Sequence, residues 1–472
     1  MHLKKIQLYW QILIALVLSI IYGLLFPTVY LFNHNSVKYL RKNHIPTEVI
    51  AKIESRENIE YHTLKDFQSE LKTILSEKEL KEYQSIIRKA GYHNPRIKAV
   101  SWMGDIFMRA LKMLIIPLIL SSLISGITNI GTGKNLGRLS LKTITYYLST
   151  SFIAIITGLF FVNILKPGIG ADLNFQETVE GLGHKQQSFF DILIGIVPQN
   201  IFQAFTEGDI IPIIFFAVLF GFFITKAKPV YSEVLTKAFN GIFDVMMRIT
   251  LFVMKFTPLG IFGIIAKVIA DQNDLGGLMS RMGLYMGTVI AALFVHFVIT
   301  LPLLVKFVGR SNPWKHFRNM STPLLTAFST SSSGATLPLT MEAVESKSGV
   351  SNKISSFTLP LGATINMDGT ALYECVAAIF IAQAYGQSLS ITQQLIIVVT
   401  ALIASVGAAA IPMAGLIMIS IILTAVGLPL EGIGLILAVD RILDMFRTAT
   451  NVWSDTCGAV IIAKSEGEQL LI

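Results

Sequence analysis

The sequence predicts an all-α polytopic membrane protein, and three observations lead to this fold class. Of the 472 residues, 53% are hydrophobic and only 14% are charged, whereas a soluble domain carries about 25% charged residues. Apolar segments long enough to cross a bilayer recur along the chain. The basic residues lie in short loops between these segments, which is typical of cytoplasmic loops. We therefore expect a multi-pass protein of the cell membrane that contacts the lipid bilayer, and the net charge of +8 does not indicate nucleic-acid binding.

The first apolar run, about residues 6–32, is too long for a signal peptide and predicts the first transmembrane helix. A hydrophilic insert at residues 33–98 follows, and we expect it outside the cell as a small helical hairpin. Its first helix should begin after Thr63. Its second helix should begin after Ser76, which can form a capping box with Glu79.

Seven further spans complete the eight expected transmembrane helices, at about residues 99–130, 142–166, 189–226, 232–270, 280–308, 354–385 and 434–463. Two other apolar segments, residues 314–346 and 392–428, are interrupted by STSSSGATLP and GAAAIPMAG. Non-helical backbone at membrane depth is tolerated only where protein or a cavity covers it, so these segments predict two re-entrant helical hairpins. Paired interruptions in the two halves of a chain also predict inverted repeats around a transport site.

The last predicted helix carries a row of polar residues at helical spacing. The row consists of Asp440, Asp444, Arg447, Asn451 and Asp455, and intervals of three or four residues place all of them on one face. Each ionisable group at the bilayer centre costs about 2.5–3.5 kcal/mol, so the four together cost roughly 10–14 kcal/mol. Packing alone does not explain such a cost. The row therefore predicts a functional site suited to a zwitterion and cations.

A second polar interruption, NMDGT at residues 366–370, lies within the predicted span 354–385. Asn366 and Asp368 offer oxygen ligands, and the following glycine allows backbone carbonyls to be exposed, as a Na⁺ site requires. The alternative is a helix kink with capping side chains. Glu374, farther along the same helix, is either a neutral buried group or a proton carrier, and helical periodicity leaves both interpretations open.

Four motifs in this order, SSSGATLP, GATINMDGTALYE, GAAAIPMAG and DRILDMFRTATNVWSD, resemble those of the dicarboxylate/amino acid:cation symporters. This family includes the excitatory amino acid transporters and prokaryotic glutamate/aspartate transporters. The resemblance implies eight helices plus two hairpins, a homotrimer, and an elevator-type transport domain that moves against a scaffold. The implied divisions are scaffold at 1–32, 99–141 and 189–279, extracellular insert at 33–98, and transport domain at 142–188 and 280–472.

The resemblance also implies roles for individual residues. Asp444 would bind the substrate ammonium and Arg447 its side-chain carboxylate. The rest of the substrate pocket would consist of Ser332, Ser333, Thr370, Ala410, Ile411, Gly415, Thr448 and Asn451. The Na⁺ sites would be formed by Tyr147, Thr150, Ser151, Gly362, Thr364, Asn366, Asp368, Asn451 and Asp455. Glu374 matches the position at which proton-coupled glutamate transporters carry Glu, so the resemblance favours a proton carrier.

The sequence is therefore expected to encode a symporter, not an enzyme, that imports L-glutamate and/or L-aspartate with Na⁺ and H⁺ and needs no cofactor. The planar guanidinium of Arg447 suits a carboxylate that binds through both oxygens. A C4-dicarboxylate or neutral amino acid symporter of the same fold is the alternative. An intramembrane aspartyl protease built on Asp368 and Asp444 is a remote one, because NMDG does not match the GxGD context of such proteases.

Overall fold

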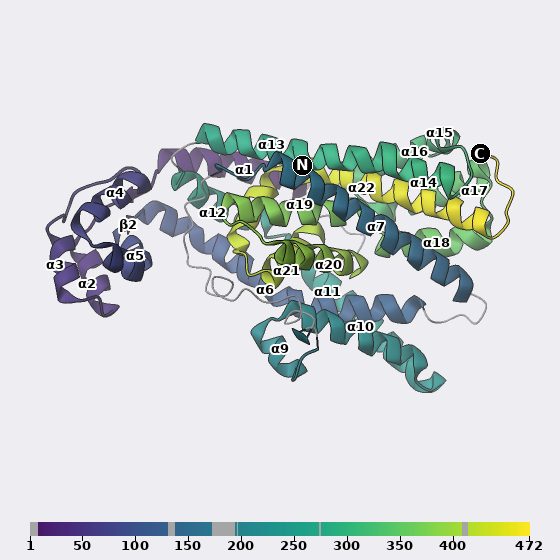
Figure 1. The fold of residues 1–472 in the computed structure, drawn as a ribbon, viewed down its shortest axis with the longest axis horizontal. Helices are drawn as coiled ribbons and strands as arrows, with labels where there is room; N and C mark the ends of the chain where they lie inside the picture. Colours follow the sequence, from purple (N-terminus) through teal and green to yellow (C-terminus); the bar gives the residue numbers. More distant parts are fainter. Residues whose placement is uncertain (1–7, 131–136, 172–193, 196, 273–274, 408–413) are drawn as a thin grey trace, which may run out of the picture. The chain divides into compact units, whose positions relative to one another are not determined.

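The computed structural model describes residues 8–130, 137–171, 194–195, 197–272, 275–407 and 414–472 (Figure 1). Its regular structure is almost entirely helical, as predicted. The chain divides into two compact units. The first, here called the insert unit, comprises Met1–Arg109, Gly170–Gly183 and Lys255–Met279. The second, here called the core unit, comprises Ala110–Ile169, His184–Met254 and Ser280–Ile472.

The insert unit contains short amphipathic helices and a two-stranded sheet. Strands β1 (Val29–Tyr30) and β2 (Tyr92–His93) pair antiparallel. The apolar faces of the four short helices between residues 34 and 91 meet in one cluster that includes Leu40, Ile53, Phe67 and Ile87. The helices are α1 (Leu8–Leu25), α2 (His34–Lys42), α3 (Thr47–Glu54), α4 (Leu64–Ile74), α5 (Glu77–Gly91), α12 (Thr257–Ala270) and the start of α6 (Pro95–Ile130).

Both predicted helix starts in the insert are confirmed. The Thr63 side chain accepts a hydrogen bond from the backbone of Asp66 at the start of α4. Ser76 and Glu79 form the complete capping box that begins α5. The prediction of a simple hairpin was wrong, because α2, α3 and the strand pair also belong to the insert. Helices of eight or nine residues are held by packing rather than by intrinsic propensity, so they leave a weak sequence signal.

The core unit is built around α22 (Ile433–Ser465), a helix of 33 residues. Helices α7, α16, α17, α18, α19 and α21 all contact it. The elements of this unit are the remainder of α6, then α7 (Gly137–Leu165), α9 (Ile201–Glu207), α10 (Ile210–Lys226), α11 (Pro229–Met254), most of α13 (Leu275–Val295), η1 (His296–Thr300), α14 (Leu301–Phe307), α15 (Pro313–Asn319), α16 (Ser321–Thr330), α17 (Ser333–Ser348), α18 (Asn352–Ile365), α19 (Asp368–Ala384), α20 (Ile391–Gly407), α21 (Ala414–Ala425), η2 (Leu430–Gly432) and α22.

Two predicted spans are broken in the structure. The span predicted at 189–226 contains α9 and α10, separated at Gly208, which has a left-handed φ of +76°. The span predicted at 232–270 consists of α11 and α12. Pro258 explains this break, because proline has no N–H group to bond to the carbonyl of Met254, where α11 ends.

The described residues contain four helices long and apolar enough to cross a membrane, or five if α11 and α12 count as one broken span. The four are Pro95–Thr128, Arg138–Leu165, Gly276–Phe307 and Asn352–Ala384. The total of eight spans therefore stays a prediction.

The first interrupted segment consists of two helices with a break, as predicted. Helix α16 ends at Thr330, Ser331 has a φ of +52°, and α17 begins at Ser333. In the second interrupted segment, α20 ends at Gly407 and α21 begins at Ala414. The residues between them lie outside the described part of the chain. The break predicted at NMDGT is confirmed, because α18 ends at Ile365 and α19 begins at Asp368.

Candidate functional site

The polar row on α22 is buried in the core unit. Asp440, Asp444, Arg447, Asn451 and Asp455 each expose at most 8% of their surface. Because five polar side chains on one face of a helix need partners once they are removed from solvent, their neighbours define the candidate site. The row is thus directed into the protein, as the sequence predicted.

Arg447 lies at the centre of an acid–base cluster. Its Nη2 atom is 2.8 Å from Oδ1 of Asp444 and 3.2 Å from Oδ1 of Asp440. The Tyr373 hydroxyl donates to the same Asp440 oxygen at 2.7 Å. The guanidinium carbon also lies 3.9 Å from the centre of the Tyr373 ring, within cation–π range. Asp440 and Asp444 of α22 and the Tyr373 ring of α19 therefore fix the position of the Arg447 guanidinium.

Part of the cluster has no hydrogen-bond partner among the described residues. This applies to Nε and Nη1 of Arg447 and to Oδ2 of Asp444. That oxygen lies 3.8 Å from Nη1 of Arg441. Buried polar atoms are rarely left without a partner, because each costs about 1–3 kcal/mol. The cluster can therefore bind both an anionic group at Arg447 and a cationic group at Asp444.

The remaining predicted substrate residues lie on several elements. Asn451 donates to Thr370 at 3.1 Å and accepts from the Gly369 amide at 2.7 Å, which joins α22 to the start of α19. Ser333 is buried and donates to the Ala363 carbonyl at 3.4 Å.

The side chain of Ser332 caps α17 by accepting from the Ala335 amide at 3.2 Å. Thr448 is buried beside Arg447 on α22. A Cβ atom on Gly415 would meet Nη1 of Arg447, so only a glycine leaves space at this side of the guanidinium. Ala410 and Ile411 lie outside the described residues.

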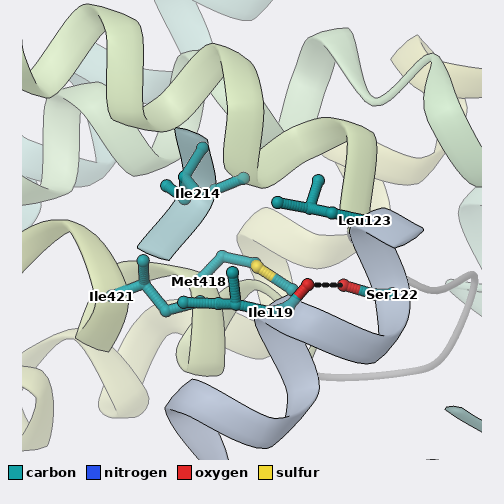
Figure 2. A pocket seen from close by; sticks show the side chains of 7 residues that line it. Ile119, Ser122, Leu123, Ile214, Met418 and Ile421 are labelled. Carbon is teal, nitrogen blue, oxygen red and sulfur yellow. Dashed lines mark hydrogen bonds between the residues drawn. The ribbon is translucent and has the colours of Figure 1, made fainter. Parts of the chain in front are cut away.

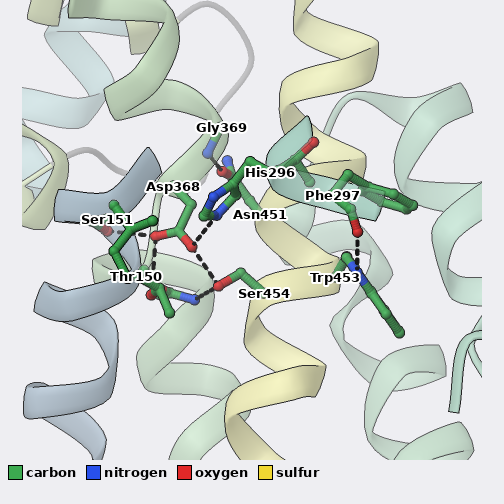
Figure 3. Close-up of polar contacts among 12 residues, drawn as sticks. Thr150, Ser151, His296, Phe297, Asp368, Gly369, Asn451, Trp453 and Ser454 are labelled. Atoms are coloured by element: carbon green, nitrogen blue, oxygen red, sulfur yellow. Dashed lines mark hydrogen bonds and ion pairs between the residues drawn. The ribbon is translucent and has the colours of Figure 1, made fainter. Parts of the chain in front are cut away.

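Asp368 receives hydrogen bonds from three different elements, as Figure 3 shows. Ser151 and Thr150 of α7 donate to its Oδ1 at 2.6 and 3.3 Å. Ser454 of α22 donates to Oδ2 at 2.6 Å, and Nε2 of His296 in η1 lies 3.1 Å from the same atom. Asp368 is fully buried. This cluster brings together the predicted cation ligands of α7 and α19 and adds two residues that the sequence analysis missed.

Asn366 links this cluster to Asp455. Its Nδ2 donates to Oδ1 of Asp455 at 2.9 Å and to Ser454 at 3.0 Å, and its Oδ1 accepts from Thr150 at 3.3 Å. A Cβ atom on Gly362 would lie 2.7 Å from the Tyr147 hydroxyl and would also meet Asp455. The predicted cation-binding residues therefore gather around the break between α18 and α19.

Two predicted cation ligands have other partners for their side chains. The Tyr147 hydroxyl donates to the Thr358 carbonyl at 2.7 Å. The exposed Thr364 side chain donates to Leu361 of its own helix at 2.9 Å. The prediction for Thr364 concerned its backbone carbonyl, which these contacts do not test.

Glu374 is fully buried, and neither of its carboxyl oxygens has a hydrogen-bond partner within the described ranges. A charged carboxylate without hydrogen bonds is very costly in an apolar environment, whereas a protonated carboxyl group is much less so. The Arg447 guanidinium interacts with this group electrostatically. Both interpretations of Glu374 from the sequence, a neutral buried group and a proton carrier, therefore remain open.

Sequence reasoning missed three residues that contact the predicted site residues, namely Tyr373, His296 and Ser454. Each acts through a partner on another helix, so helical spacing alone could not reveal it. His296 had one usable signal, because it is a lone ionisable residue in the apolar segment ALFVHFVIT. Asp440 was part of the predicted row, but its bond to Arg447 was not predicted.

A small cavity lies between α6, α10, α20 and α21, and no residue of the polar row lines it (Figure 2). It encloses about 10 Å³, which is room for one water molecule at most. Its lining is apolar apart from Ser122, whose hydroxyl is bonded to its own helix at 3.3 Å. The cavity therefore offers no alternative ligand site. It is lined by Ile119, Ser122, Leu123, Ile214, Ala404, Met418 and Ile421.

Comparison with known proteins gives one consistent result. The sequence profile of the sodium:dicarboxylate symporter family matches residues 8–465. Excitatory amino acid transporter 3 of Mus musculus is 37% identical over 420 residues, which cover 78% of this chain and 79% of that protein. The proton/glutamate-aspartate symporter of Escherichia coli (strain K12) is 36% identical over 379 residues, which cover 78% and 86% of the two chains. Excitatory amino acid transporter 1 of Ambystoma tigrinum is 36% identical over 421 residues, covering 78% and 77%.

Proposed function

Because this chain belongs to the sodium:dicarboxylate symporter family, we propose that it imports L-glutamate and/or L-aspartate together with Na⁺ and H⁺ as a secondary active symporter. Two relatives point to this substrate class by name, since one is a proton/glutamate-aspartate symporter and the other an excitatory amino acid transporter. The protein is a transporter and not an enzyme. Its place is the cell membrane, where the apolar helices contact lipid.

The observation that carries the substrate proposal is the acid–base cluster of Arg447 and Asp444. An acidic amino acid carries one ammonium group and two carboxylates. Nε and Nη1 of Arg447, which have no hydrogen-bond partner among the described residues, match its side-chain carboxylate. Oδ2 of Asp444, which likewise has no hydrogen-bond partner there, matches its ammonium. A neutral amino acid would leave the guanidinium donors unsatisfied, and a C4-dicarboxylate would place a second anion near the Asp444 carboxylate. The cluster therefore favours an acidic amino acid over both alternatives.

The Na⁺ proposal rests on the buried carboxylates of Asp368 and Asp455. Within the described ranges, the side chains that form hydrogen bonds with them carry hydroxyl, amide and imidazole groups. A buried negative charge is stable only when it is paired or binds a cation. Oxygen ligands around the α18–α19 break suit a hard cation such as Na⁺. Transported Na⁺ would thus supply the positive charge that these acids lack.

The proposed cycle uses the membrane potential as well as the Na⁺ gradient. Three Na⁺, one H⁺ and one mono-anionic substrate would carry three net charges inward, which is worth roughly 7 kcal/mol per 100 mV. Glu374 would carry the proton, because its neutral form suits the buried site. We further propose the predicted assembly, in which eight helices and two hairpins form a scaffold and a transport domain that moves as an elevator within a homotrimer.

The test is uptake of labelled L-aspartate and L-glutamate by proteoliposomes under an inward Na⁺ gradient. Accumulation should require the gradient and increase with a negative interior potential. Equal Na⁺ on both sides is the control, and it should permit exchange but no accumulation. Unlabelled succinate and L-alanine should compete poorly. The substrate proposal fails if either of them displaces the label while aspartate does not.

A further inference from the structure

The span from α13 to α14 contains one turn of π-helix, η1. In this turn the Leu301 amide donates to the His296 carbonyl, five residues earlier. In the same register the Phe297 carbonyl would pair with the amide of residue 302. Residue 302 is proline, which has no N–H group. The sequence therefore leaves the Phe297 carbonyl without a donor from its own helix.

Trp453 of α22 supplies the missing donor. Its Nε1 donates to the Phe297 carbonyl at 3.0 Å, as Figure 3 shows. The Trp453 side chain is buried, and its ring lies 5.7 Å from the Phe297 ring and 5.1 Å from the His316 ring. This hydrogen bond fixes the π-helical turn to α22 at Trp453, the residue that precedes Ser454.

This connection places His296 beside Asp368. His296 is fully buried, and its Nε2 lies 3.1 Å from Oδ2 of Asp368. An ionised carboxylate only accepts hydrogen bonds, so Nε2 carries the proton. Nδ1 has no donor within the described part of the chain. The ring therefore donates one hydrogen bond to Asp368 through Nε2.

We propose that His296 is a positioning residue for the cation site. With Ser454 it holds Oδ2 of Asp368, and this fixes the carboxylate plane so that Oδ1 is directed toward the hydroxyls of α7 and the transported Na⁺. Residues that orient a metal ligand in this way typically contribute 10- to 100-fold to metal affinity. This inference rests on the proposed function, because it assumes that Asp368 binds Na⁺.

Two substitutions of His296 separate this role from simple core packing. In Gln the side-chain amide nitrogen reaches the level of Nε2, whereas in Asn it reaches only the level of Nδ1. Both residues are polar and smaller than histidine, so both disturb packing. H296Q should keep the hydrogen bond to Asp368, and H296N should lose it. Pro302→Ala provides an independent variant that leaves His296 intact. Alanine restores the backbone amide donor at position 302 and allows the α-helical register. In that register the His296 side chain should turn away from Asp368.

The experiment is a Na⁺ titration of the full-length protein in lipid nanodiscs without substrate, followed by tryptophan fluorescence and by the thermal unfolding midpoint. Bound Na⁺ raises the midpoint, since it binds the folded state. The apparent Na⁺ affinity should fall about tenfold or more in H296N and in P302A, and it should change less than threefold in H296Q.

The outcomes are distinguishable. Unchanged Na⁺ affinity in H296N, or equal losses in H296N and H296Q, would overturn the positioning role. If H296N does not fold, P302A tests the proposal instead, because a helix tolerates the removal of a proline. Unchanged Na⁺ affinity in P302A overturns the proposal. A wild-type protein that shows no response to Na⁺, with choline as control, would instead overturn the proposed function and the inference with it.

Discussion

Replacing Arg447 with cysteine should convert the substrate preference from acidic to neutral amino acids. Arg447 is the buried cation that holds Asp440 and Asp444, and two of its nitrogens remain available to a ligand. Cysteine removes the positive charge and the planar donors, and it leaves space beside the glycine at position 415. Asp444 remains to bind a substrate ammonium. The variant should therefore still bind amino acids, but only those without a second carboxylate.

The magnitude follows from the bonds that are lost. A hydrogen bond to a charged group contributes about 1.5–3 kcal/mol. Two such bonds to the substrate carboxylate therefore contribute about 3–6 kcal/mol, which is roughly a 10²- to 10⁴-fold loss of aspartate affinity at about 1.4 kcal/mol per tenfold. Losing one partner of a buried ion pair also destabilises the fold by about 3–5 kcal/mol. Folding must therefore be measured separately from transport.

Competition assays in proteoliposomes measure this effect, with labelled L-aspartate and labelled L-serine as the two substrates. Arg441→Cys is the matched control, because Arg441 lies on the same helix and only 3.8 Å from Asp444 but is 42% exposed. Such exposed pairs contribute about 0–1 kcal/mol, so aspartate uptake should change less than about sixfold. A Na⁺-dependent rise in the unfolding midpoint would show that the Arg447 variant is folded. Unchanged aspartate uptake in folded R447C, or an equal loss in R441C, would refute the assigned role.

Three further predictions concern other parts of the chain. Glu374→Gln should remove the pH dependence of uptake while Na⁺-driven exchange persists, and transport measured between pH 6 and 8.5 would test this. Gly362→Ala should weaken the apparent Na⁺ affinity about tenfold, because the added Cβ would lie 2.7 Å from the Tyr147 hydroxyl; Na⁺ titration of uptake checks it. The hydrogen bond from Lys52 lowers the pKa of Glu79 to about 2 from its ordinary 4.5, so its stabilisation of the insert is present above pH 4.5 and disappears as the pH falls toward 2. Protection of α5 from hydrogen exchange in the full-length protein should be lower in E79Q at pH 6, and the difference should vanish near pH 2.

The sequence predicted the site best where the signal was local. Polar residues at helical spacing revealed the row on α22, and its burial is confirmed. The capping box at Ser76 and the break at NMDGT were also found, because the responsible residues are neighbours in the chain. Because charged groups are costly to bury in a membrane, the row indicated a functional site even though none of its contacts was known.

The features that were missed depend on contacts between distant segments. The bond from Trp453 to the Phe297 carbonyl joins residues 156 positions apart, and no periodicity predicts it. Pro302 could indicate an irregular helix, but a proline can equally well produce a kink. The role of His296 follows only when η1, α19 and α22 have been placed together. Tertiary hydrogen bonds of this kind determine the site, and a single sequence does not encode them in a local pattern.

The charges of the site indicate an order of binding. The buried carboxyl groups of the site, on Asp368, Asp440, Asp444 and Asp455, outnumber the buried guanidinium of Arg447 and the partly exposed one of Arg441. An acidic amino acid adds one more negative charge, and a buried excess of negative charge is unfavourable in a low-dielectric interior. Na⁺ should therefore bind before the substrate, and L-aspartate affinity should rise steeply with the Na⁺ concentration. Calorimetric titration with L-aspartate in choline and in Na⁺ tests this order, and tight binding in choline would contradict it.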